Sequence, residues 1–203
     1  MSIKLSKTSK MPAKSWSLPA VVTCPAALKD GELVDVCKSC YADKGFYNMP
    51  TVKAPRYHNM EDWKRDGWVD EMIEALYNQK FFRWFDSGDM YHVKLANKIL
   101  KVIEGTPNCK HWLPTRMYKF DKFRKILNKI NKLPNVVVRI SSDSLVGDRV
   151  DVDGLANSTV VPKGTIGVDS SVWLCHASTN DGKCGDCRAC WSKDVKTVAY
   201  VYH

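Results

Sequence analysis

The chain has 203 residues and a formal net charge of +9, with 44% hydrophobic and 26% charged residues. This balance is that of a soluble globular protein, formed of one domain or one domain with a small appendage. No run approaches the roughly 18 apolar residues of a membrane span. The basic residues 1–16 precede no apolar stretch, so we expect neither a membrane contact nor a secretory signal. The positive charge favours acidic partners, either nucleic acid or an anionic small molecule.

The predicted elements alternate between strands and helices along the chain. Strand-like runs lie at 19–24, 81–86, 111–115 and 135–143, with further candidates at 158–161, 172–175 and 197–202. Apolar residues recur at helical spacing over 59–79, 91–104 and 117–132. This is the order of βαβ units, so we predict an α/β fold with a partial, barrel-like parallel sheet. The chain is shorter than the about 250 residues of a full (β/α) barrel.

Two segments differ in composition. Residues 1–150 carry the strong strand and helix patterns and are predicted to form the α/β domain. Residues 151–203 have weaker patterns around Gly- and Asp-rich loops and hold four of the cysteines, so we predict a cysteine-rich, metal-binding extension. We expect it to pack on the first segment as one unit.

The predicted strand ends carry polar or metal-binding side chains. They are Cys24, the turn Asp86-Ser87-Gly88-Asp89, Thr115-Arg116 and Ser141-Ser142-Asp143. In parallel α/β folds, chemistry collects at the carboxyl ends of the strands. A shared site at these ends is therefore one interpretation, and the ordinary polarity of loops is the other.

Four cysteines crowd the C-terminal part of the chain: Cys175, Cys184, Cys187 and Cys190. In a reducing cytoplasm, clustered cysteines indicate metal ligands rather than disulfides. A C-x2-C-x2-C loop can wrap three corners of a [4Fe–4S] cluster, and a remote fourth thiolate completes the set. Structural zinc usually takes its ligands as two separated pairs. The spacing favours an iron–sulfur cluster, with zinc and free thiols as the alternatives.

Three more cysteines, Cys24, Cys37 and Cys40, lie in the N-terminal part. Three thiolates leave one iron of a [4Fe–4S] cluster open to an exogenous ligand, such as the amino and carboxylate groups of S-adenosylmethionine (SAM). The alternative is a zinc site completed by Cys109, His58 or another residue. Four protein ligands, as in the C-terminal group, leave no open iron.

Seven stretches of the sequence together closely resemble one protein family. They are SKMPAKSWSLPAVVTCP, CKSCYADKG, KAPRYHN, FRWFDSGDMY, HWLPTRMYKF, NVVVRISSDS and KCGDCRACW. The chain resembles the gene product eighty-eight family of small tailed-phage proteins. This resemblance implies a phage origin, and hence the cytoplasm of an infected bacterium.

Three shorter motifs, CxxCYA, FDSGD and RISSD, distantly resemble radical SAM proteins. The resemblance implies that Cys24, Cys37 and Cys40 ligate the SAM cluster and that the C-terminal cysteines hold an auxiliary cluster. It also implies two sets of SAM contacts. Ser87, Gly88 and Asp89 would face the SAM ammonium, and Arg139, Ser141 and Ser142 its carboxylate or ribose.

Two classes of function follow. The first is an enzyme that reductively cleaves SAM and needs an electron donor. The second is a non-catalytic iron–sulfur or zinc protein that binds nucleic acid or a host protein. Helix 117–132 favours a nucleic-acid partner because one face carries only lysines, although a solvated exterior is the ordinary reading of such a face. These lysines are Lys119, Lys122, Lys125, Lys129 and Lys132.

Overall fold

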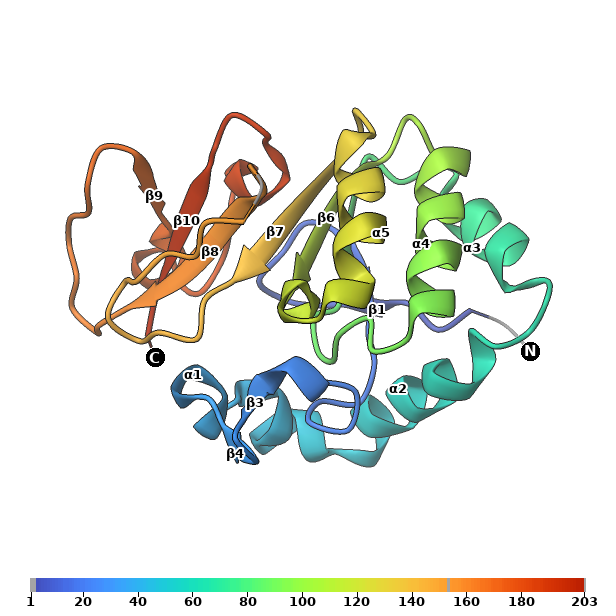
Figure 1. Ribbon diagram of the computed structural model, residues 1–203, viewed down its shortest axis with the longest axis horizontal. Coiled ribbons are helices and arrows are strands. Elements are labelled where there is room, and N and C mark those ends of the chain that lie inside the picture. The colour runs from blue at the N-terminus through green and yellow to red at the C-terminus, as the bar shows by residue number, and fades with distance from the viewer. Residues whose placement is uncertain (1–2, 153, 203) are drawn as a thin grey trace.

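An open sheet of eight strands organises the chain (Figure 1). The computed structural model describes residues 3–152 and 154–202. The strands of the sheet are β1 (Ser6–Lys7), β2 (Lys14–Trp16), β5 (Phe81–Trp84), β6 (Lys110–Thr115), β7 (Val136–Ser141), β8 (Ala156–Val161), β9 (Val172–Leu174) and β10 (Thr197–Val201). Their order is β1-β2-β5-β6-β7-β8-β10-β9, and only β1 and β2 pair antiparallel.

Five α-helices and a small hairpin accompany the sheet. The helices are α1 (Asp35–Lys38), α2 (Pro50–Asp62), α3 (Trp68–Leu76), α4 (Val93–Gly105) and α5 (Asp121–Lys132). The hairpin pairs β3 (Leu28–Lys29) with β4 (Glu32–Leu33). Helices α3, α4 and α5 lie side by side along the sheet, whereas α1, α2 and the hairpin form a separate layer below it in Figure 1. Among the described residues, no helix is long and apolar enough to cross a membrane.

The core forms where α3, α4 and α5 meet the sheet. Helix α4 buries Leu95, Ala96, Ile99, Val102 and Ile103, and α5 buries Phe123, Ile126, Leu127 and Ile130. This spacing of three and four residues places each set on one helical face. Trp16, Trp68 and Trp84 are fully buried, and the Trp16 ring lies 5.3 Å from Trp68 and 6.1 Å from Trp84, edge to face. Such aromatic packing stabilises the core beyond its buried area.

The sheet confirms the predicted α/β class and the parallel pairing, but it is open and not a barrel. Its edge strands, β1 and β9, have two and three residues and do not pair with each other. In a parallel (β/α) barrel each strand is followed by a helix, and the two edge strands pair to close the sheet. After β7 no α-helix occurs in the described part of the chain, so β8, β10 and β9 extend the sheet without curling it closed.

Two predicted elements are wrong in detail. Residues 19–24, predicted as a strand, form turns, and the strand lies earlier, at β2. Because Val21 has a φ of 64° and Val22 is exposed, this apolar run cannot pair as a strand of the sheet. The predicted helix 59–79 is two helices, α2 and α3. They are separated at 63–67, where the Arg65 side chain binds Asp62 and Glu71 and holds the turn. The remaining predicted strands and helices occur within a few residues of their expected ranges.

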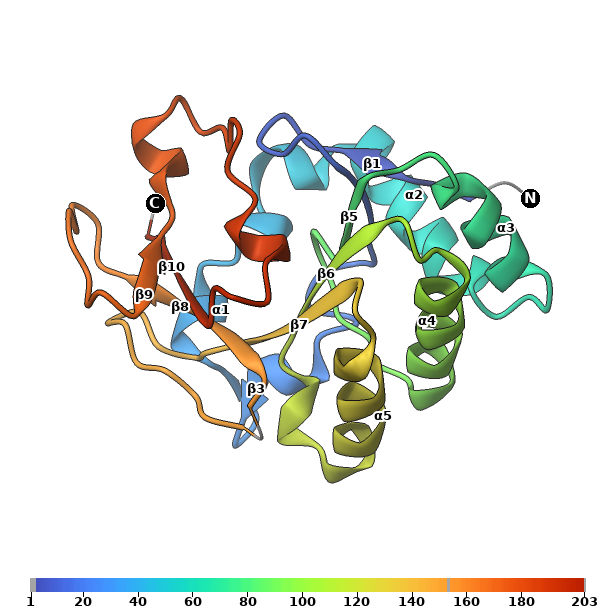
Figure 2. The same ribbon diagram turned by 90° about the horizontal axis from the view of Figure 1, so that it is seen from above.

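The C-terminal residues complete the sheet. Strand β8 pairs with β7 and β10 pairs with β8, so residues 156–201 share a ladder with the earlier chain (Figure 2). The loop that carries the C-terminal cysteines follows β9 and returns to β10. It therefore starts and ends at one edge of the sheet.

Candidate functional site

The layer formed by residues 20–62 covers the carboxyl edge of β5, β6 and β7 (Figures 1 and 2). Several hydrogen bonds attach it there, and three of them come from different parts of the layer. Tyr41 Oη donates to the Asp86 carbonyl (2.7 Å), the Val36 amide donates to the Asp143 carbonyl (3.4 Å) and Lys119 Nζ donates to the Ala26 carbonyl (2.9 Å). We call this segment the edge layer. Because it contains Cys24, Cys37 and Cys40, it brings these cysteines to the strand ends.

The three cysteines of the edge layer, here the early group, influence one another electrostatically. Burial, followed by the nearby Asp89 carboxylate, raises the pKa of Cys24 to about 12, and Cys37 and Cys40 add to the rise. Burial also raises the pKa of Cys37, while the Arg116 guanidinium opposes the rise. The three thiols are therefore near enough to influence one another, with the Asp89 carboxylate and the Arg116 guanidinium of the strand ends also acting on them.

The turn after β5 is held by its own contacts. Ser87 Oγ donates to the Leu18 carbonyl (2.7 Å) and accepts from Arg56 Nε (2.7 Å). Gly88 has a φ of +76°, and a Cβ there would lie 2.5 Å from Thr23 Oγ1 and 2.6 Å from Leu18 Cβ. The glycine is thus required by close packing against residues 18–23, the stretch that precedes Cys24.

Asp89 is buried at the centre of the same edge. Its Oδ1 accepts from Thr115 Oγ1 (2.7 Å) and from the Met90 amide (2.7 Å), and its Oδ2 accepts from the Arg116 amide (2.8 Å). Burial raises the pKa of this carboxyl group. Asp89 therefore joins the ends of β5 and β6, which places it beside the early group.

The end of β7 adds a cluster of charges. Asp143 accepts from Lys119 Nζ (2.6 Å) and from Arg116 Nε (3.3 Å), and Arg116 also donates to the Ser142 carbonyl (2.8 Å). Ser141 Oγ lies 3.5 Å from Ser158 Oγ on β8. Two cations thus share one carboxylate next to Cys37.

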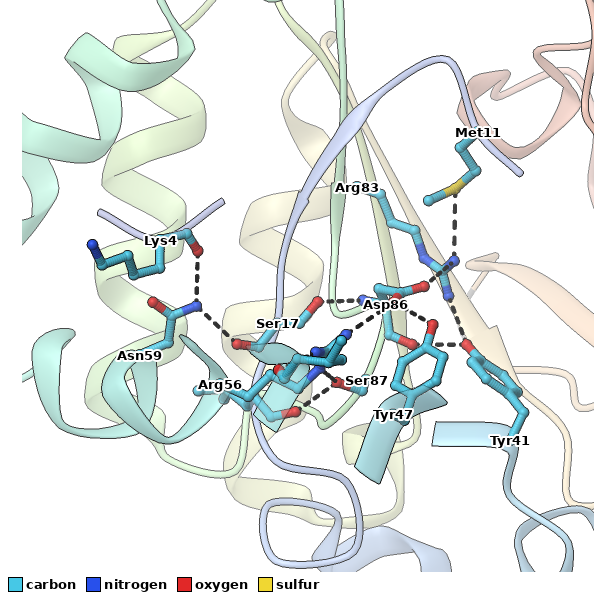
Figure 3. Close-up of polar contacts among 12 residues, drawn as sticks. Lys4, Met11, Ser17, Tyr41, Tyr47, Arg56, Asn59, Arg83, Asp86 and Ser87 are labelled. Carbon is cyan, nitrogen blue, oxygen red and sulfur yellow. Dashed lines mark hydrogen bonds and ion pairs between the residues drawn. The ribbon is translucent and has the colours of Figure 1, made fainter. Parts of the chain in front are cut away.

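A second polar cluster centres on Asp86, as Figure 3 shows. Its Oδ1 accepts from Arg83 Nη1 (3.1 Å), and its Oδ2 accepts from Tyr47 Oη (2.6 Å) and from Arg56 Nη2 (3.5 Å). Arg83 Nη2 also reaches Tyr41 Oη at 3.5 Å. Sequence reasoning did not single out Arg83, Arg56, Tyr41 or Tyr47. The available signal was a charged residue inside the aromatic run FFRWF, because a charge on a buried strand must have a partner.

The four C-terminal cysteines, here the late group, line a single cavity of about 20 Å³. Trp173, His176 and Trp191 complete much of its wall. Burial raises the pKa of Cys190 to about 11, opposed by a hydrogen bond with Tyr200 Oη at 3.2 Å and by the positive charge of Arg139. The four cysteines thus line one cavity, across the gap of eight residues between Cys175 and Cys184.

Arg139 lies beside the late group and not at the strand ends where the radical SAM resemblance put it. Its fully buried guanidinium donates to backbone carbonyls only. The acceptors are the carbonyls of Asn157 (2.9 Å), Lys196 (3.3 Å), Ala189 (3.3 Å), Ser192 (3.4 Å) and Val195 (3.0 Å). Arg139 is inside β7, paired with Pro114 and Ala156, so its side chain leaves the sheet two residues before the edge.

Two unpaired atoms near the late group are informative. The Nε atoms of Arg139 and Arg83 are buried without a hydrogen-bond partner among the described residues. No carboxylate in the described chain forms an ion pair with Arg139. A buried guanidinium normally has an anionic partner.

The other candidate ligands stand apart. Cys109 precedes β6, at the amino edge of the sheet, whereas the early group is at the carboxyl edge; a strand of six residues spans about 20 Å. His58 lies 3.7 Å from Asp62 on its own helix. All eight cysteines are free thiols. Among the described residues, no three His, Cys, Asp or Glu side chains converge closely enough to hold a single metal ion.

Comparison with known proteins identifies a family. The chain matches the family described as Gene product 88 over residues 2–193. No curated protein and no solved structure matches it. Because the match covers nearly the whole chain, including both groups of cysteines, this protein belongs to the gene product 88 family.

Proposed function

We propose that this protein is an iron–sulfur protein with two centres. The late group, Cys175, Cys184, Cys187 and Cys190, holds a four-thiolate [4Fe–4S] cluster. The early group, Cys24, Cys37 and Cys40, holds a three-thiolate cluster whose open iron takes a small ligand, with SAM as the first candidate. The setting remains the one that the family resemblance implies, the cytoplasm of an infected bacterium.

The observation that carries the proposal is the buried Arg139 beside Cys190. Its guanidinium cannot lose its proton, and no described carboxylate balances its charge. A four-thiolate [4Fe–4S] centre is an anion and would supply that balance. Its sulfur atoms are hydrogen-bond acceptors, and the Nε donors of Arg139 and Arg83 have no partner among the described residues. Neutral thiols would leave both needs unmet.

The arrangement of the late thiols suits a cluster better than one ion. The ligands of a cluster stand farther apart than those of a single zinc, because each thiolate binds a different iron. The cavity of about 20 Å³ has room for roughly one water molecule. Loading therefore requires the loop to open. The opening would involve residues 178–183, 185 and 186, which are exposed.

The early group differs in having only three thiolates, and its surroundings favour an anionic ligand. Arg116 and Lys119 share Asp143 beside Cys37, which leaves one positive charge in excess. An α-carboxylate, such as that of SAM, can pair with this charge. We place Ser87, Gly88, Asp89, Ser141 and Ser142 around the ligand, as the radical SAM resemblance implies, and replace Arg139 by Arg116 as the cationic contact.

The role of the described residues is to bind and orient. Arg116 and Lys119 would hold the ligand carboxylate, and the buried Asp89 would face its ammonium. The edge layer would exclude water from the thiols. The cluster itself would supply one electron to the sulfonium of SAM, received in turn from an external donor. The proposed activity is therefore that of a radical SAM-type enzyme.

The test is iron and sulfide analysis of protein purified without oxygen. We expect about eight irons and eight sulfides per chain, corresponding to two [4Fe–4S] clusters. Cys37→Ser and Cys187→Ser should each remove about half, and the matched control Cys109→Ser should remove none. SAM added to dithionite-reduced protein should alter the EPR signal that Cys37→Ser abolishes, and 5′-deoxyadenosine should form. Colourless protein with about one zinc per group would contradict the proposal.

A second candidate function rests on helix α5. Lys122, Lys125, Lys129 and Lys132 are exposed on it, and Asp121 is the only acid in the helix. Such a face can bind nucleic acid through phosphate contacts. Binding of a DNA or RNA oligonucleotide should then weaken steeply between roughly 50 and 200 mM salt and be lost in Lys125→Glu/Lys129→Glu. Iron content should not change in that variant.

A further inference from the structure

Arg83 connects the early and late groups of cysteines. On the early side, its Nη2 lies 3.5 Å from the hydroxyl of Tyr41, the residue that follows Cys40 in the chain. The Tyr41 ring is also in edge-to-face contact with Tyr47, at 5.3 Å between ring centres. Figure 3 shows Arg83 approaching Tyr41 and Asp86 from above, with Met11 on its other side.

On the late side, the same guanidinium lies over the Trp112 ring, 4.4 Å from its centre. Trp112 packs edge to face on Trp191, with 5.3 Å between ring centres, and Trp191 follows Cys190 directly. Cys184 and Cys190 pack against the small apolar cluster that contains Trp112 and Trp191. A continuous run of contacts therefore leads from Cys40 to Cys190, with Arg83 at its middle.

The charge on Arg83 is only partly balanced. Arg83 and Arg56 bind different oxygens of the single Asp86 carboxylate, so two cations face one anion. The Arg83 side chain is 14% exposed, which limits screening by water and salt. Its Nε has no hydrogen-bond partner. The excess positive charge therefore lies between the two groups of cysteines, in surroundings of low dielectric constant.

We propose that Arg83 is a shared counter-charge that raises the reduction potentials of both centres. This inference rests on the proposed function, because it requires a cluster at each group. One electron enters each centre from dithionite and makes that centre more negative. A nearby fixed cation stabilises the reduced form relative to the oxidised form, so the potential rises. Arg83 would act through space on the charge of each cluster, and it would not bind iron.

The test is an EPR-monitored redox titration of the whole protein with dithionite and mediators. Arg83→Met should lower the equilibrium constant for reduction of each centre about tenfold, which is about 59 mV for one electron. Arg83→Lys keeps the charge and should stay close to the wild type. Arg124→Met is the control for the loss of a positive charge elsewhere: it removes an exposed arginine that pairs with Asp121 on α5, and it should leave both centres unchanged. Circular dichroism checks folding, and Arg83→Gln serves if Arg83→Met does not fold.

The outcomes separate this inference from the proposed function. If the wild type shows two centres and neither potential moves in Arg83→Met, the role of Arg83 is overturned while the iron–sulfur assignment stands. A shift in only one centre overturns the shared role. Wild-type protein without iron overturns both. Equal shifts in Arg83→Met and Arg83→Lys would indicate an effect of shape and not of charge, and would also overturn it.

Discussion

The early and late groups of cysteines are held in different ways. The early group depends on the edge layer, a separate stretch of chain that lies over polar strand ends and is attached by hydrogen bonds to Asp86 and Asp143. The late group depends on one short loop and on Arg139, which binds the carbonyls of Ala189, Ser192 and Val195 around Cys190. One site is thus assembled by long-range packing and the other by local spacing around a buried cation. The two should respond to different mutations.

The largest effect is expected from Arg139→Met. The change removes the buried cation and leaves its carbonyl acceptors without a donor, so the free energy of unfolding should fall by about 3–5 kcal/mol. The late centre should be lost and the early centre kept, which halves the iron content. Urea unfolding and iron analysis measure the two effects. Arg149→Met, which loses one exposed contact with Ser171, is the control; wild-type behaviour of Arg139→Met would contradict the account.

The opposite pattern is expected from Gly88→Ala. The added Cβ would collide with Thr23 and Leu18 at a residue with positive φ, and relief of the collision must move the stretch that leads to Cys24. We expect a loss of about 2–4 kcal/mol and loss of the early centre alone. Gly154 also has a positive φ, +70°, but a Cβ there would meet open space. The control Gly154→Ala therefore measures the backbone strain alone, which is about 1 kcal/mol. Equal losses in the two variants would show that packing at Gly88 is unimportant.

Acid should weaken the core that both groups share. Burial lowers the pKa of His111 on β6 to about 3, and its Nε2 lies 2.9 Å from Thr106 Oγ1. The unfolded chain binds a proton at this residue below about pH 6.5, whereas the folded chain does not. Stability is therefore complete above pH 6.5 and falls by about 1.4 kcal/mol per pH unit toward pH 3. In His111→Gln, chemical unfolding across this range should show a shallower slope; an unchanged slope would exclude His111 as the cause.

The smallest effect is expected from Tyr47→Phe. It removes one hydrogen bond to Asp86 Oδ2 and leaves Arg83 and Arg56 in place, so the loss should be about 1 kcal/mol. The edge layer should loosen first, which hydrogen exchange of residues 35–48 would detect. Tyr77→Phe, at a side chain that is 80% exposed, should change nothing. Faster exchange in the loop that carries the late group would instead mean that the edge layer and this loop are not independent.

The difference between local spacing and long-range packing also explains which features could be predicted from the sequence. Strands β5, β6 and β7 and helix α4 have strong local periodicity, and their positions were predicted. The spacing of Cys184, Cys187 and Cys190 also indicated a common site by itself. The edge layer has no such signal, because residues 20–48 contain short turns whose positions depend on contacts with distant strand ends. Strand β2 was missed since its three residues are stabilised by the neighbouring β5 and not by their own pattern.

Arg139 shows a limit of motif resemblance. The RISSD motif suggested a ligand contact at the end of β7, yet the arginine lies inside the strand and its guanidinium reaches the C-terminal segment. A motif gives the residue type but not the face on which a long side chain ends. Arg116, which the sequence already put at the end of a predicted strand, occupies the edge instead. The placement of Arg139 became clear only from the pairing of β6, β7 and β8.

The most direct test is an anomalous difference map from a crystal grown without oxygen, with data collected on both sides of the iron absorption edge. We predict two separate peaks, one enclosed by Cys24, Cys37 and Cys40 and one by Cys175, Cys184, Cys187 and Cys190, each with the weight of several irons. Single-atom peaks at the zinc edge, or continuous density for disulfides between these cysteines, would contradict the account.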